Sequence, residues 1–186
     1  LKNYQSTSLS GVPYSFEILK KLRFFQLDLP YLKTITQAGG KLNDELNREF
    51  ALFCKENDKR FFVMYGQTEA SPRMSYLPSE YSISKLGSVG IAIPGGKFSL
   101  VDVNSEVITK DETVGELIYE GSNVSMGYAL YGEDLAKDDE NNGILKTGDM
   151  AKRDTDSFYY IVGRKKRFIK LYGNRVNLDD IEQLLK

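Results

Sequence analysis

Apolar and polar positions in the first eighty residues alternate between a helical and a strand period. Pro13 suits the first turn of a helix, and apolar residues recur after it at helical spacing, at Phe16, Leu19 and Leu22. The segment Leu32–Gln37 then has the pattern of a short strand, which small residues bring to an end. The pattern therefore predicts a helix followed by a strand.

A second helix and a second strand repeat this order. Asn43 suits an N-cap, because its side chain can accept from the free backbone N–H groups of a first helical turn. Leu46, Phe50 and Phe53 then share one helical face. Arg60–Tyr65 is an apolar, β-rich run of the kind found in buried parallel strands. We expect an α/β layer over this part of the chain.

Beyond Tyr81 the pattern changes to short strands separated by Gly and Pro. The polar interval Gly132–Gly143 is predicted to be a surface loop, and Thr147-Gly148 is predicted to be a turn before Asp149. The strands predicted here are Lys97–Val103, Val114–Glu120, Asp156–Val162 and Arg167–Tyr172. This half of the chain is therefore expected to be β-rich.

These patterns predict three segments. Residues 1–80 form the α/β portion, residues 81–162 form a β-rich subdomain, and residues 163–186 begin a further unit, with a new strand near Gly163. Asn177 suits the N-cap of a helix that opens at about Leu178. Because Leu1 is not an initiator Met and no C-cap follows that last helix, we expect the natural protein to continue in both directions.

The composition excludes several classes of catalyst. The 186 residues include no His, so the chain cannot itself supply a Ser-His-Asp triad, a histidine general base or a histidine metal ligand. The single cysteine, Cys54, cannot form an internal disulfide and falls in the apolar register of the second predicted helix. That position is typical of a small core residue in a reducing compartment.

Charge and hydropathy narrow the set of partners. The chain has 25 Lys and Arg against 26 Asp and Glu, a net charge of −1, so it lacks the positive field that nonspecific nucleic-acid binding requires. No apolar run approaches the ~20 residues that span a bilayer, and no signal-peptide pattern is present. We expect a soluble, cytoplasmic protein that has neither a nucleic-acid partner nor a membrane span.

Polar residues follow the predicted strand Arg60–Tyr65, in the order Gly66-Gln67-Thr68-Glu69. Ligands of open α/β sheets bind beyond the carboxyl ends of the strands. A threonine hydroxyl can donate to a phosphate oxygen, and a glutamate is an oxygen ligand of the kind that Mg²⁺ takes. Taken alone, the same residues are better explained as an ordinary exit from a strand into a loop.

Two later segments carry further candidate groups. Asp149 can accept from two vicinal hydroxyls, as a carboxylate that binds a ribose does, although an Asx-turn explains it equally. Arg164, which follows Gly163, can contact a ribose or a phosphate, or be solvated at the surface. The basic run Arg164–Arg167 is explained either as a solvated face or as a nucleic-acid patch that lacks an aromatic platform.

The order of these pieces resembles the AMP-forming adenylating superfamily, which comprises acyl-CoA synthetases, peptide-synthetase adenylation domains and luciferases. The resemblance covers most of the chain from about residue 30. Its segments are AGG (38–40), YGQTE (65–69), GSVGIAIPG (87–95), GELIYEGSNVSMGY (115–128), TGD (147–149) and GRKKRFIKLYGNRV (163–176). The fold that this implies is part of the large α/β domain with a small β-rich subdomain and the start of a C-terminal lid.

The resemblance also implies a reaction. In this superfamily an ionised carboxylic acid attacks the α-phosphorus of ATP, which gives an acyl-adenylate and pyrophosphate, and a thiol then displaces AMP. The implied cofactors are ATP or AMP, Mg²⁺, and CoA or the phosphopantetheine of a carrier protein, and the implied substrate is a small carboxylic acid. A carboxylate is already nucleophilic at pH 7, so the lack of histidine is compatible with this chemistry.

The resemblance assigns one group of residues to the base and the acyl group. Gly39, Gly40 and Lys41 match the loop that borders adenine, where glycines let the backbone approach the ring. Tyr65 matches the aromatic residue on the other side of the nucleotide, and Gly66 the position that leaves room for the acyl group.

A second group is assigned to the ribose and phosphates. Thr68 matches the hydroxyl that contacts phosphate, and Glu69 the Mg²⁺ ligand. Asp149 matches the acid that holds the ribose hydroxyls, and Arg164 its basic companion. The resemblance therefore implies that these four side chains meet around one nucleotide.

The last group concerns the lid. Lys166 matches the hinge about which the lid swings, and Gly173 and Arg175 fall in the turn that reaches the pantetheine channel in CoA-using members. The hinge is often acidic in the superfamily, so Lys166 is a departure, as are Phe168 in place of a common Gln and Ser157 in place of a common turn Gly. Phe168 and Ser157 do not fall on a proposed nucleotide contact, whereas Lys166 leaves the geometry of the lid swing open.

Two expected elements have no counterpart in the sequence. The Ser/Thr/Gly-rich phosphate loop of the superfamily is not found before residue 30, and the lysine of the lid is expected beyond Lys186. Loss of even one such charge-stabilising group slows catalysis by ~10²-fold to 10³-fold. We therefore expect a fragment of an adenylating enzyme that has little or no turnover by itself.

Three functional hypotheses remain open at this point. The first is an acid–thiol ligase of the acyl-CoA synthetase type. The second is an adenylation domain that loads an amino or aryl acid onto a carrier protein, although no acid that would bind an α-amine is evident upstream of residue 30. The third is a non-catalytic pseudoenzyme or interaction module, against which the intact Thr68, Glu69, Asp149 and Arg164 argue.

Overall fold

The computed structural model describes residues 1–171 and 174–178, with only the backbone described for Lys2 and for residues 167–171 and 174–177. The chain divides into two compact units. The first unit comprises residues 1–66 and 72–93, and the second comprises residues 67–71 together with everything after residue 93. The chain therefore enters the second unit briefly, directly after a strand of the first.

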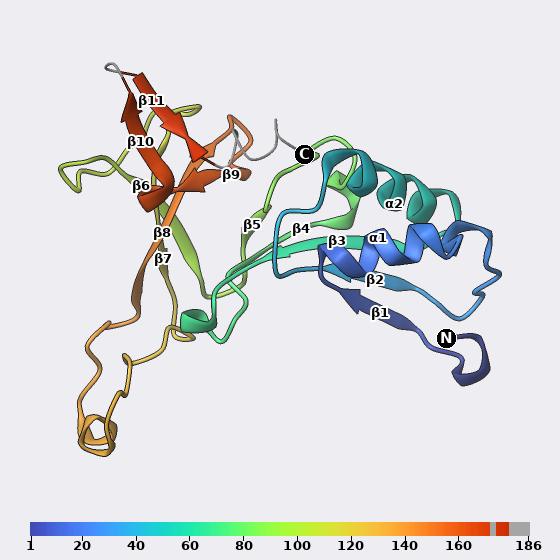
Figure 1. Ribbon diagram of the computed structural model, residues 1–186, viewed down its shortest axis with the longest axis horizontal. Helices are drawn as coiled ribbons and strands as arrows, with labels where there is room; N and C mark the ends of the chain where they lie inside the picture. The colour runs from blue at the N-terminus through green and yellow to red at the C-terminus, as the bar shows by residue number, and fades with distance from the viewer. Residues whose placement is uncertain (172–173, 179–186) are drawn as a thin grey trace. The chain divides into compact units, whose positions relative to one another are not determined.

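The first unit is a five-stranded sheet with two helices on one side (Figure 1). Its strands are β1 (Ser8–Gly11), β2 (Thr34–Gln37), β3 (Arg60–Tyr65), β4 (Ser75–Leu77) and β5 (Ile91–Ala92), in that spatial order, and its helices are α1 (Pro13–Lys21) and α2 (Asp44–Glu56). The first three strands run parallel and the last two antiparallel. The carboxyl ends of the parallel strands therefore meet at one edge.

Phenylalanine rings from both helices and β3 form the core of this unit. Phe16, Phe50 and Phe61 are fully buried, with ring centroids 4.8 Å apart for Phe16 and Phe50 and 6.1 Å apart for Phe16 and Phe61. Phe24 lies on the same cluster, 5.7 Å from Phe50. Edge-on ring pairs of this kind contribute about 0.5–1.5 kcal/mol beyond the burial of their apolar surface.

The start of α2 and its single cysteine follow the sequence predictions. The Oδ1 of Asn43 accepts from the backbone N–H groups of Glu45 and Leu46, at 2.9 and 3.3 Å, so Asn43 is the N-cap. Cys54 is buried on the apolar face of α2, and this burial raises the pKa of its thiol to about 12. Because the thiolate is the reactive form, Cys54 is an inert core residue.

The second unit contains a four-stranded antiparallel sheet and a two-stranded hairpin. The sheet consists of β6 (Lys97–Val101), β7 (Gly115–Glu120), β8 (Ile144–Arg153) and β9 (Tyr159–Arg164), and the hairpin of β10 (Phe168–Leu171) and β11 (Asn174–Asn177). Phe98, Tyr119 and Tyr159 pack together on one face of the sheet, with Phe98 5.5 Å from Tyr119 and 5.1 Å from Tyr159 between ring centroids.

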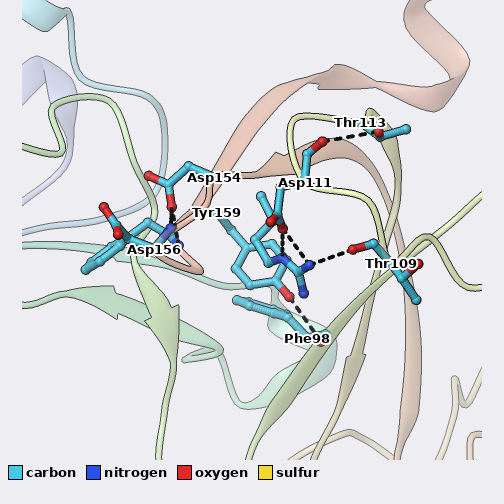
Figure 2. Close-up of polar contacts among 9 residues, drawn as sticks. Phe98, Thr109, Asp111, Thr113, Asp154, Asp156 and Tyr159 are labelled. Carbon is cyan, nitrogen blue, oxygen red and sulfur yellow. Dashed lines mark hydrogen bonds and ion pairs between the residues drawn. The ribbon is translucent and has the colours of Figure 1, made fainter.

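A polar cluster ties the connection between β6 and β7 to this sheet (Figure 2). Arg153 donates through Nε and Nη2 to Oδ1 of Asp111, at 2.8 and 2.6 Å, and also to the carbonyl of Thr109 at 3.0 Å. The hydroxyl of Tyr159 donates to the carbonyl of Phe98 at 3.2 Å. All of these atoms belong to loop and strand positions that organise the sheet, so the cluster is structural.

The structure confirms the α/β fold class and corrects several elements. The predicted strands Arg60–Tyr65 and Val114–Glu120 are present within one residue of their predicted bounds, whereas β1, β4, β5 and β8 were not predicted. Leu22, which was predicted on the apolar face of the first helix, is instead the C-cap that follows α1, and it is 67% exposed. The expected strand Asp156–Val162 begins only at Tyr159, because Asp154 accepts from the backbone N–H groups of two later residues and forms a turn.

Two predictions near the end of the chain have different outcomes. Gly163 lies inside β9 and does not begin a new strand. The helix predicted from about Leu178 falls almost wholly outside the described residues. The division into segments 1–80, 81–162 and 163–186 stays a prediction.

Candidate functional site

The candidate site begins where β3 ends. Tyr65 is the last residue of β3, and its carbonyl accepts from the backbone N–H of Met74 at 3.0 Å. A Cβ atom at Gly66 would lie 1.6 Å from the carbonyl oxygen of Pro72. Any side chain at this position would collide with backbone, so Gly66 is required by the local fold, whatever room it also leaves for a ligand.

A short 3-10 helix, η3 (Thr68–Ala70), carries the next two candidate groups. Thr68 is exposed and Glu69 is half-buried, while Ala70 is fully buried and fixes the turn. The hydroxyl of Tyr128 donates to Oε1 of Glu69. This hydrogen bond is the largest of several effects that lower the pKa of Glu69, and the positive charge of Arg164 is one of the others. The carboxylate is therefore ionised at neutral pH.

Asp149 lies in the middle of β8, in place of the predicted turn. The pairing of β7 with β8 shifts register between Glu116 and Ile118, opposite Thr147-Gly148, and Gly148 has φ +69°. A bulge of this kind bends a strand and redirects its side chains, and glycine adopts the left-handed backbone without strain. The turn chemistry expected from Thr-Gly is therefore accommodated inside a continuous strand.

The register of β8 and β9 places Arg164 directly opposite Asp149. Nε of Arg164 lies 2.7 Å from Oδ1 of Asp149, which forms an ion pair. Asp149 is only 2% exposed, whereas the side chain of Arg164 is 56% exposed. The carboxylate is thus held in place by the ion pair, and the guanidinium extends into solvent with further N–H donors that can bind a ligand.

The other oxygen of Asp149 is bound by a residue that the sequence interpretation did not single out. Nε2 of Gln67 donates to Oδ2 of Asp149 and to the carbonyl of Thr147, each at 2.9 Å. Thr147 in turn donates from its hydroxyl to the carbonyl of Leu117 at 2.7 Å and accepts from the backbone N–H of Asp149 at 3.0 Å. The only sequence signal for Gln67 was its position between Gly66 and Thr68.

The structure therefore brings together the groups that the sequence predicted to converge. Glu69, Asp149 and Arg164 belong to the same compact unit, linked by the Asp149–Arg164 ion pair and by the electrostatic effect of Arg164 on Glu69. Thr68 adjoins Glu69 on η3. The cluster combines a buried acid, an exposed guanidinium, an exposed hydroxyl and an ionised carboxylate.

The glycines assigned to adenine belong to the first unit, at the carboxyl edge of its parallel strands. Gly39 has φ +82° and Gly40 has φ +158°, values that favour glycine. Nε2 of Gln37 donates to the carbonyl of Gly40 at 2.7 Å and braces the loop. Lys41 is exposed, and Tyr65 lies at the end of the neighbouring strand β3.

The residues assigned to the lid are only partly described. Lys166 is exposed and lies in the short 3-10 helix η6 (Lys165–Arg167), between β9 and β10. Gly173 lies outside the described residues, and Arg175 is described only as a backbone position of β11. The structure therefore leaves the roles of Gly173 and Arg175 as predictions.

Comparison with known proteins identifies the family. Residues 1–129 match the family described as AMP-binding enzyme. A long-chain-fatty-acid–CoA ligase of Salmonella typhimurium is 32% identical over 186 residues, which cover 100% of this chain and 32% of that protein. The chain belongs to the AMP-binding enzyme family. The AMP-forming adenylating superfamily predicted from the sequence is thereby confirmed.

Other AMP-binding enzymes resemble the chain in sequence and in structure. Probable 4-coumarate–CoA ligase 1 of Dictyostelium discoideum is 32% identical over 165 residues, which cover 86% of this chain and 28% of that protein. The o-succinylbenzoate CoA synthetase (MenE) of Bacillus subtilis, in complex with its acyl-adenylate intermediate OSB-AMP, superposes with a TM-score of 0.81 at 25% identity, covering 98% of this chain and 36% of that one.

The N-terminal domain of FACL13 from Mycobacterium tuberculosis shares the fold at 20% identity, with a TM-score of 0.69 over 86% of this chain and 39% of that one. The chain spans about a third of the length of the relatives that it matches. Within the described residues, no helix combines the length and the apolar character needed to cross a membrane.

The described residues can be tested for a site that would bind Mg²⁺. Among the described residues there is no cluster of three or more His, Cys, Asp and Glu side chains that could hold a metal ion. Mg²⁺ does not need one, because it commonly binds one or two carboxylates together with substrate phosphates and water. The half-buried, ionised Glu69 is a carboxylate of the kind that could serve as such a single protein ligand.

Proposed function

We propose that the protein carrying this chain is an AMP-forming acid–CoA ligase. It activates a carboxylic acid as an acyl-adenylate, with release of pyrophosphate, and transfers the acyl group to the thiol of CoA with release of AMP. The observation that carries the proposal is the convergence of Glu69, Asp149 and Arg164 in one compact unit. The names of the relatives, which are CoA ligases and a CoA synthetase, support the same reaction.

In this proposal Asp149 binds the ribose of ATP. In the structure, Oδ1 of the carboxylate pairs with Nε of Arg164, and Oδ2 accepts from Nε2 of Gln67. The two oxygens of a carboxylate together offer about four acceptor sites, which suits the recognition of two vicinal hydroxyls. The buried position and the two donors fix the carboxylate in one orientation before the ligand arrives, which reduces the entropic cost of binding.

In this proposal Thr68, Glu69 and Arg164 bind the phosphates of ATP. The hydroxyl of Thr68 is exposed and can donate to a phosphate oxygen, and the exposed guanidinium of Arg164 can place positive charge near the ribose or the α-phosphate. Glu69 would hold Mg²⁺, which supplies neutralisation of phosphate charge when it is bound. The substrate carboxylate needs no general base, so positioning and charge neutralisation are the main contributions of the protein.

The remaining assignments complete the proposal. Gly39, Gly40 and Lys41 border the adenine, Tyr65 packs against the nucleotide, and Gly66 lies near the acyl group. Lys166 acts as the hinge of a lid, and Gly173 and Arg175 lie along the path of the CoA pantetheine. We place the protein in the cytoplasm, where ATP and CoA are available. Residues 1–186 alone are expected to show little turnover, because they span only a third of the relatives.

The experiment is an ATP–pyrophosphate exchange assay on the full-length protein, with hydroxycinnamic, medium-chain and long-chain fatty acids, followed by detection of the acyl-CoA product. We expect exchange that requires an acid and Mg²⁺, and CoA thioester formation with the same acid. Asp149→Asn serves as the negative control, because it is expected to lose ATP–pyrophosphate exchange while it stays folded. The proposal fails if the protein neither binds ATP or AMP in calorimetry nor catalyses exchange with any acid.

A further inference from the structure

A segment far from η3 in sequence reaches back to it and contacts it three times. The segment, residues 121–128, leaves the end of β7. The backbone N–H of Ser125 donates to the carbonyl of Glu69 at 2.8 Å, and Nδ2 of Asn123 donates to the carbonyl of Ala70 at 2.6 Å. The third contact is the hydrogen bond from the hydroxyl of Tyr128 to the carboxylate of Glu69.

The root of this segment is fixed by a buried tyrosine. Tyr119 is fully buried, and its hydroxyl donates to Oδ1 of Asn123 at 2.8 Å. A Cβ atom at Gly96 or Gly121 would approach that hydroxyl to 2.4 or 2.7 Å, so both glycines are needed to make room for it. Asn123 is thereby oriented from one side by Tyr119 and donates on the other side to η3.

The far end of the segment is fixed by the loop that follows it. Nδ2 of Asn141 donates to the carbonyl of Ser125 at 2.7 Å, and the backbone N–H of Glu140 donates to the carbonyl of Met126 at 2.8 Å. Gly127 has φ +150°, a conformation that favours glycine. The backbone is therefore held in place at Ser125 and Met126, directly before Gly127 and Tyr128.

Packing does not explain the position of Tyr128. Tyr128 is 70% exposed, so burial of its ring contributes little to holding the side chain in place. What the structure shows at the end of this side chain is a hydroxyl bonded to Oε1 of Glu69. A hydroxyl that binds one carboxylate oxygen restricts rotation of the carboxylate and so sets the direction of Oε2.

We infer that Tyr128 is a positioning residue for Glu69: its hydroxyl holds one carboxylate oxygen so that the other is presented to Mg²⁺ bound with the ATP phosphates. This inference rests on the proposed function. Groups that hydrogen-bond to a metal-binding side chain orient it, and their removal typically weakens metal affinity by about 10-fold to 100-fold. Tyr128 acts through Glu69 and has no contact of its own with the reacting atoms in this role.

The test compares Tyr128→Phe with Tyr131→Phe in the full-length protein. Tyr131 is a matched control, because it lies in the same loop and is similarly exposed, at 73%. Calorimetry measures ATP affinity at a series of Mg²⁺ concentrations and in the absence of divalent cations. Circular dichroism confirms that both variants fold, which is expected because the hydroxyl removed is at an exposed site.

For Tyr128→Phe, we expect the Mg²⁺ concentration at half-maximal enhancement of ATP binding to rise by about tenfold, with cation-free ATP affinity unchanged. Tyr131→Phe should match the unsubstituted protein. In a Glu69→Gln background, Tyr128→Phe should cause no further change, because the group that it positions is no longer a carboxylate. A structural role alone would instead weaken ATP binding equally with and without the cation.

Two results would overturn the inference in distinguishable ways. If the unsubstituted protein shows no Mg²⁺-dependent binding of ATP, the proposed function fails and the role of Tyr128 falls with it. If the unsubstituted protein shows this dependence and Tyr128→Phe retains it in full, or loses cation-free affinity to the same degree, the positioning role alone is wrong.

Discussion

Substitution of Asp149 by Asn changes one atom of the side chain and tests the ribose-binding role. In the structure, Oδ1 faces Nε of Arg164 at 2.7 Å and Oδ2 faces Nε2 of Gln67 at 2.9 Å, both donors. An asparagine must direct its own N–H groups at one of them and loses the ion pair. Because the side chain of Arg164 is 56% exposed and stays solvated, we expect unfolding to become easier by only about 1 kcal/mol.

The expected effect on nucleotide binding is larger. A hydrogen bond to a charged group contributes about 1.5–3 kcal/mol. Loss of one such bond to the ribose corresponds to a roughly 10-fold to 150-fold weaker binding of AMP. The nucleotide affinity should therefore change by more than the stability does.

The assay is a double-mutant cycle in which residue 149 of the protein and the ribose hydroxyls of AMP are both varied. Calorimetry measures the affinities of the unsubstituted protein and of Asp149→Asn for AMP and for its 2′-deoxy and 3′-deoxy analogues. The unsubstituted protein should lose at least tenfold in affinity when a hydroxyl that Asp149 contacts is removed, whereas Asp149→Asn should lose far less, because its bond to that hydroxyl is already weakened. Equal losses in both proteins for both analogues would refute a contact between Asp149 and the ribose.

Three further predictions concern the fold of the first unit. Gly66→Ala should lower the free energy of unfolding by about 1–3 kcal/mol or more, because its Cβ would overlap the carbonyl of Pro72; a stability equal to that of the parent in urea denaturation contradicts this. Asn43→Ala should cost about 1 kcal/mol in the same assay, and Asn43→Asp much less, because aspartate also caps. Between pH 8 and 10, ionisation of Cys54 should lower the free energy of unfolding by about 1.4 kcal/mol, because the pKa of the thiol is about 12 in the folded chain and near 9 in the unfolded chain, which therefore releases the proton first. Cys54→Ala should lack this pH dependence, and an identical pH dependence in both proteins would show that the thiol titrates normally.

Local features of this protein were readable in the sequence. The cap at Asn43, the apolar face that buries Phe50 and Cys54, and the strand Arg60–Tyr65 depend on groups a few residues apart, and all are present in the structure. The order of the motifs also identified the family, because each motif is a short, contiguous segment. Periodicity and capping report on neighbours within about one helical turn, and this is the range over which those predictions succeeded.

The partners in the candidate site were decided by the tertiary structure. The sequence predicts a turn at Thr147-Gly148, before Asp149, but the bulge at Gly148 lets β8 continue, and the register of β8 with β9 sets Arg164 opposite Asp149. Gln67 binds an acid 82 residues away, and Tyr128 binds a glutamate 59 residues away. No local pattern encodes such pairs, because strand register and loop anchoring bring these atoms together only once the sheet of the second unit has formed.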